Sequence, residues 1–115
     1  MKKLALKHAF MLARIIKAAN IRDEIVKFAG ELHSGMTVDE IGLEFAVVMI
    51  QAAADEKAEK KIYELYAELK GVKPEEVAEY DFATVKEDMK ALVEENDLKS
   101  FFQSVSALMS KQYNY

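Results

Sequence analysis

Short helical segments, separated by cap and turn signals, are the feature that most constrains the fold of this chain. The only proline is Pro74 and four glycines occur, so few positions interrupt a regular backbone. Apolar residues recur at intervals of three and four, as on one face of a helix, and no useful stretch alternates with the period of two typical of a strand. The sequence therefore predicts an all-α fold.

Cap signals place the ends of the expected helices. Thr37 and Glu40 have the spacing of a capping box, Asp55 and Asp81 are N-cap residues, and Gly71 is a helix stop. The centre of the third helix, 45–50, is apolar on all sides, which indicates burial on most faces. We expect one domain over residues 1–115, a compact bundle of about six or seven short helices around a buried central helix at about 38–54. The tail, 111–115, is expected to fray.

The first helix, from about residue 4 to 19, is basic and amphipathic. Its helical period gives an apolar face that packs into the core, made of Leu6, Phe10, Ala13 and Ile16 and widened by Leu12 and Ile15. Four cations share one stripe because they are separated by four, seven and three residues: Lys3, Lys7, Arg14 and Lys17. We expect this basic face to take part in self-association.

Net charge divides along the chain. Residues 1–27 carry seven Lys or Arg against two acids, a net +5, whereas residues 28–115 carry nine Lys against eighteen Asp or Glu, a net −9. Two such surfaces attract each other, either between copies of the chain or within one fold whose first helix packs on acidic neighbours. Both interpretations stay open.

Residues able to do chemistry are few. There is no cysteine, and the two histidines, His8 and His33, lie on different segments without an acid at metal-site spacing. His8 is expected on the flank of the basic helix and His33 in a loop. Adjacent acids fall at helix starts or on polar faces, where capping explains them. No Gly-rich phosphate loop or nucleophile motif occurs. We expect no enzyme, no catalytic residue, no metal and no cofactor.

Nucleic acid and membrane are not expected as partners. The basic stripe is Lys-rich without Asn or Gln placed to read bases, and the acidic remainder of the surface would repel phosphate. The first helix lacks the uninterrupted apolar core of a signal peptide, and no window is apolar over the ~18 residues needed to span a bilayer. The expected location is the cytoplasm.

The last helix carries a wide apolar face that is either core or a partner-binding surface. Phe and Met suit surfaces that adapt to helical partners. The candidate partner-binding residues are Phe101, Phe102, Val105, Leu108 and Met109.

Segments at both ends of the chain resemble small tail assembly chaperones of long-tailed phages and prophages of Gram-positive bacteria. These are Lys7 to Asn20 and Glu94 to Ser104, and the layout between them is similar to that of the family. The resemblance implies a non-catalytic protein of the bacterial host cytoplasm that binds the helix-rich tape-measure protein, helps recruit tail tube subunits and forms homo-oligomers. Two other classes remain open on the residues alone, a small helical immunity or antitoxin-like protein and a helical DNA-binding regulator.

Overall fold

Seven α-helices make up the structure, a computed structural model that describes residues 1–32 and 35–113, with side chains up to residue 109. No strand occurs among these residues, so the all-α prediction is confirmed. The helices are α1 (Leu6–Ala19), α2 (Arg22–Glu31), α3 (Val38–Ala52), α4 (Glu56–Lys70), α5 (Pro74–Val77), α6 (Phe82–Glu95) and α7 (Leu98–Tyr113).

The predicted caps begin and end the helices. Thr37 Oγ1 accepts a hydrogen bond from the Glu40 amide at 3.1 Å, and the Glu40 carboxylate accepts one from the Thr37 amide at 3.4 Å. Asp55 and Asp81 likewise accept from amides in the first turns of α4 and α6. Gly71 ends α4 at φ 80°, a left-handed conformation that a residue without a Cβ adopts at little cost.

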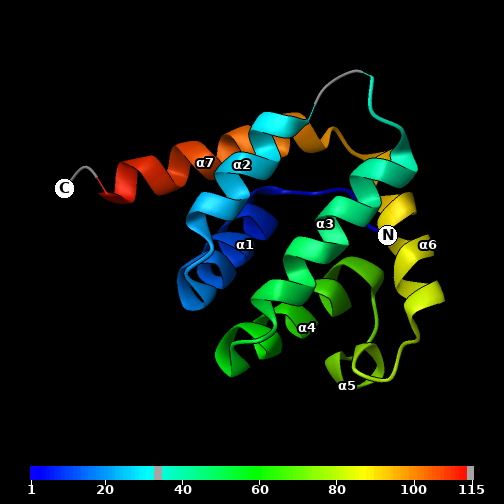
Figure 1. Ribbon diagram of the computed structural model, residues 1–115. Helices are drawn as coiled ribbons and strands as arrows, with labels where there is room; N and C mark the ends of the chain where they lie inside the picture. The colour runs from blue at the N-terminus through cyan, green and yellow to red at the C-terminus, as the bar shows by residue number, and fades with distance from the viewer. Residues whose placement is uncertain (33–34, 114–115) are drawn as a thin grey trace.

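Helix α1 is the hub of the packing. It lies behind α2 and α3 and contacts α4, α7, α2 and α3 (Figure 1). Helix α6 packs on α3 at one side of the molecule, and α5 packs on α4. The C-terminal part of α7 runs past α1 and α2 to the edge of the molecule (Figure 1).

The expectation that the helix at 38–54 is the buried centre is wrong. Helix α3 ends at Ala52 and buries only one side, while Leu43, Val47 and Ile50 are 51%, 42% and 56% exposed. The reason is that α3 has α2 and α6 at its flanks and solvent in front, so its all-round apolar character exceeds what its neighbours can cover.

The predicted inner face of α1 is correct at Leu12, Ala13, Ile15 and Ile16, which are buried, and wrong at Leu6 and Phe10. Leu6 and Phe10 are 67% and 43% exposed, whereas His8, Leu12, Ile15 and Ile16 are almost fully buried. Apolar residues occupy so much of this helix that two rotational phases are compatible with the sequence. The observed phase turns His8 inward, not onto the flank.

Two expectations fall partly outside the described residues. His33 lies outside them, so its expected loop position stays a prediction. Helix α7 continues to Tyr113, beyond the expected start of a frayed tail at residue 111, and residues 114 and 115 lie outside the described part.

Replacing Phe102 by Ala tests the position of the core. Phe102 is fully buried, and its ring contacts those of Phe28 and Phe45 at centroid distances of 4.9 and 5.5 Å. We expect Phe102→Ala to lower the free energy of unfolding by about 3–5 kcal/mol in urea titrations. Phe10→Ala is the matched control and should cost about 0.5 kcal/mol, because that ring is partly in water. Equal losses would contradict the observed phase of α1.

Candidate functional site

The predicted partner-binding residues of the last helix lie mainly in the core. Phe102, Val105 and Met109 are buried, and Phe101 and Leu108 are partly buried against the core. Together they hold α7 against α1 and α2. The monomer therefore does not present this face to a partner, and a binding role for these five residues remains a prediction.

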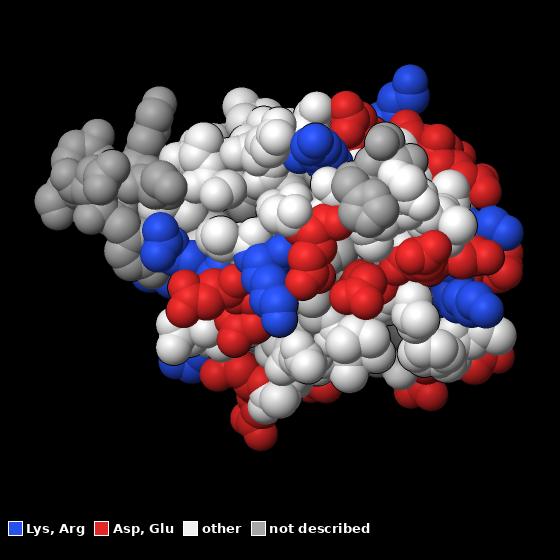
Figure 2. Space-filling view, turned by 45° about the horizontal axis from the view of Figure 1, so that its top comes forward, with Lys and Arg blue, Asp and Glu red and all other residues white. Residues whose placement is uncertain are grey.

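The predicted basic face lies on the outside of the molecule. All four predicted cations are exposed: Lys3, Lys7, Arg14 and Lys17. Lys3 precedes α1, and the other three lie on this helix together with the exposed Leu6 and Phe10. Lys7 Nζ contacts Glu68 Oε1 of α4 at 2.8 Å, whereas the other three cations form no ion pair with a described residue. Their use in self-association is untested. Elsewhere the surface carries abundant acidic groups with bases between them (Figure 2).

An apolar cavity of about 270 Å³ lies between α3, α4, α5 and α6 and opens to solvent. Met49 of α3 and Met89 of α6 line it, and aromatic rings from α3, α4 and α7 complete the wall, including Phe45, Tyr66 and Phe101. The cavity exists because α4 packs toward α1 and α5, while α6 packs toward α3. The space between α4 and α6 is therefore left without a helix to fill it.

Polar groups bridge α4 and α6 at the edge of the cavity. The Tyr66 hydroxyl donates a hydrogen bond to Asp88 Oδ2, and Lys70 Nζ lies 2.8 Å from the same oxygen. Lys70 also lies 4.2 Å above the centre of the Tyr80 ring, a cation–π contact. Burial and the bond to Asp88 raise the pKa of the Tyr66 phenol, and the bond to Asp88 raises the pKa of Lys70. At neutral pH the phenol therefore keeps its proton and Lys70 its charge.

The residues before α1 cover one side of the cavity. Met1 and Leu4 line it. The Lys2 amide donates to the Leu69 carbonyl at 2.7 Å, and the Leu4 amide donates to Asn96 Oδ1 at 2.8 Å. These two bonds tie the segment to the end of α4 and to the junction of α6 and α7.

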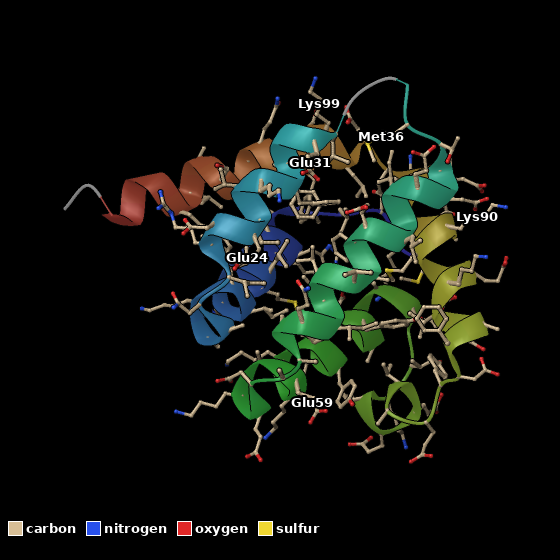
Figure 3. All side chains as sticks on the ribbon, in the orientation of Figure 1. Glu24, Glu31, Met36, Glu59, Lys90 and Lys99 are labelled. Atoms are coloured by element: carbon tan, nitrogen blue, oxygen red, sulfur yellow. The ribbon has the colours of Figure 1, made fainter. Side chains whose placement is uncertain are left out.

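An exposed apolar stripe leads to the cavity along α3. Leu43, Val47 and Ile50 are spaced by four and three residues, so they share one side of the helix, and Ile50 also lines the cavity. Phe82 of α6, 57% exposed, shares a small surface hollow with Leu43. Charged groups border the stripe: Lys90 of α6 projects outward (Figure 3), 3.9 Å from Asp39 of α3. We call Leu43, Val47, Ile50 and Phe82 the α3 stripe.

His8 is engaged in a structural hydrogen-bond chain away from the cavity. Its Nδ1 accepts from the Ala5 amide at 2.8 Å, so the proton sits on Nε2, which donates to Glu68 Oε2. Glu68 also accepts from Lys7 Nζ at 2.8 Å and Lys2 Nζ at 3.3 Å. The bonds from Lys7 and then His8 lower the pKa of the Glu68 carboxyl to about 2.

The cavity and the stripe are sites that sequence reasoning missed. Met49, Met89 and Tyr66 have the spacing of ordinary core positions, and nothing in the pattern separates a residue that lines a cavity from one that is packed. Within residues 1–32 and 35–113 no group of three or more His, Asp or Glu side chains is arranged to hold a metal ion. None of the described helices is long and apolar enough to cross a membrane.

The Glu68 cluster predicts a defined acid sensitivity. Because the pKa of Glu68 is about 2 in the fold and near 4.5 when unfolded, its contribution is complete above pH 4.5 and disappears as the pH falls toward 2. We expect Glu68→Gln to lower the free energy of unfolding at pH 7 by about 1 kcal/mol, since the ion pairs with the exposed Lys2 and Lys7 are screened by solvent. The difference in the free energy of unfolding between the wild type and Glu68→Gln should shrink as the pH falls below 4.5.

Glu64→Gln is the control for Glu68→Gln, because Glu64 is exposed on the same helix and forms no ion pair with a described residue. Chemical denaturation between pH 2 and 7 measures both differences. A Glu68→Gln difference that stays constant down to pH 2 would show that the carboxylate charge is not what stabilises the cluster.

Known proteins add nothing to this geometry. No protein-family model, no curated protein and no solved structure matches the chain. The cavity and the α3 stripe are therefore the features of this chain that bear most directly on its function.

Proposed function

We propose that this chain is a non-catalytic tail assembly chaperone that binds the tape-measure protein and helps recruit tail tube subunits. The observation that carries the proposal is the α3 stripe, an exposed apolar helix side that runs into the mouth of an apolar cavity. The resemblance of the two ends of the sequence to that family supports the choice of client.

The physical properties of the stripe suit a helical client. An amphipathic helix presents apolar side chains at intervals of three and four, and Leu43, Val47 and Ile50 repeat with the same intervals. A contiguous group of large exposed apolar side chains marks an interaction surface, whereas single exposed apolar residues are common and carry no such meaning. Met49 and Met89 in the adjoining cavity are flexible, which helps one surface accept different apolar side chains.

Charge at the rim favours reversible binding. Glu40 and Glu44 are exposed next to the stripe on α3, and Lys86 and Lys90 stand beside it on α6. Such rim charges change association rates and exclude wrong partners more than they add affinity. A chaperone that must leave its client needs that balance.

Val47→Glu tests the client surface. We expect wild-type protein, produced together with an apolar helical fragment of a tape-measure protein, to keep that fragment in the supernatant after centrifugation. A glutamate in the middle of the stripe would have to be desolvated on binding, so Val47→Glu should release the fragment into the pellet. The measurement is the soluble fraction of the fragment.

Val26→Glu is the matched control, because it introduces the same change on another helix, α2. Val26 is 45% exposed and Val47 is 42% exposed. It should leave the fragment soluble. If Val47→Glu keeps the fragment soluble, or if wild type does not, the α3 stripe is not the client site.

Self-association through the basic face of α1 is part of the same proposal. Arg14 and Lys17 are exposed without a described ion-pair partner, near Leu6 and Phe10, and the rest of the chain carries a net negative charge. An acidic surface of a second copy would complement this face.

The oligomer should depend on these charges. We expect concentration-dependent oligomers in light scattering at low salt, weaker at about 1 M salt because the charges are then screened. The double variant Arg14→Glu, Lys17→Glu should be monomeric, whereas Lys57→Glu and Lys61→Glu together, on α4, should not change the mass. A wild-type monomer at every concentration would contradict self-association.

A further inference from the structure

We propose that the cavity between α3, α4, α5 and α6 binds one neutral aromatic molecule of about two fused rings. This site adjoins the client surface and shares Ile50 with it, but it needs only the interior of the cavity and not the exposed residues Leu43, Val47 and Phe82. The inference goes beyond the proposed function and does not depend on it.

Size is the first argument. The cavity measures about 270 Å³. An engineered cavity of about 150 Å³ lined by aliphatic and phenyl groups stays dry and accepts benzene. A space nearly twice as large accommodates a second fused ring.

The lining selects aromatic over aliphatic ligands. Rings of Phe45, Tyr66, Tyr80 and Phe101 face the cavity, and Tyr66 and Tyr80 already make an edge-on pair with centroids 5.8 Å apart. Aromatic rings prefer such edge and offset contacts with one another. Thioether sulfurs, here from Met49 and Met89, add favourable contacts with ring edges.

The polar atoms of the lining select a neutral ligand. Tyr66 donates its hydroxyl proton to Asp88, and Tyr63 donates its own to Glu59 at 3.2 Å. No lining side chain is Lys, Arg or His. The ammonium of Lys70, which lies over the Tyr80 ring, is paired with Asp88 at 2.8 Å. A ligand carboxylate would therefore lose its hydration without gaining a cationic side chain.

A ligand can enter the cavity near the C-terminal end of α3. Ile50 and Ala78 both line the cavity and are exposed, so they mark its mouth.

Methionine methyl groups give a direct test, because the chain divides them evenly. Met1, Met49 and Met89 line the cavity, whereas Met11, Met36 and Met109 do not. With the methyl carbons labelled, titration of the full chain with naphthalene should produce saturable ring-current shifts at the first three signals only. 2-Naphthoate has the same rings and a charge, and its dissociation constant should be at least about tenfold higher.

Two variants and a matched control complete the test. Ala53→Phe, at the half-buried end of α3, and Ala78→Phe, at the exposed mouth, place a ring in the site and should each weaken naphthalene binding about tenfold or more. Ala54→Phe is exposed outside the cavity and should leave binding unchanged. Circular dichroism checks that each variant is folded.

Three results would overturn the proposal. These are the absence of saturable shifts, shifts spread over all six methionines, and naphthoate binding as tightly as naphthalene. Loss of binding in Ala54→Phe to the same extent as in Ala53→Phe would also exclude this cavity as the site. None of these outcomes bears on the client experiment with Val47→Glu, so the two proposals fail separately.

Discussion

The burial of α1 is the constraint on which the rest of the structure depends. This helix contacts α2, α3, α4 and α7, so its orientation decides where each of them lies. Its phase is set at the start by His8, whose ring accepts from the Ala5 amide and donates to Glu68 of α4. A buried imidazole must have both nitrogens paired, and only one rotation of the helix brings it to Glu68. That rotation leaves Leu6 and Phe10 in solvent.

The cavity follows from this arrangement. Because α4 is drawn to α1 through Glu68 and close packing, and α6 is drawn to α3, the two helices diverge from each other. Only side chains span the space between them: Tyr66 and Lys70 from α4 meet Asp88 of α6. Asp88 can accept from both donors only at one separation of α4 and α6. These bonds therefore fix the distance between two walls of the cavity.

Local signals in this sequence predicted helix ends well and packing poorly. The capping box at Thr37, the Asp55 and Asp81 caps and the Gly71 stop depend on neighbours within four residues, so a linear pattern contains them in full. The side of a helix that faces the core depends on other helices. Where a helix carries more apolar residues than its neighbours bury, as in α1 and α3, periodicity leaves the limits of the inner side undetermined. The cavity is less visible still, because it is a space between helices and no residue pattern within one helix encodes it.

The excess of apolar residues over core positions is itself informative about function. Several large apolar side chains are exposed, and an apolar cavity opens beside one of them, Ile50. They include Leu6, Phe10, Leu43, Val47, Ile50 and Phe82. A chain selected only for stability would gain by placing larger side chains at Ala53 or Ala78 and polar ones along the α3 stripe. The retained apolar surface and the retained space therefore favour binding as the task of this face, with the stripe taking an extended apolar partner and the cavity a compact one.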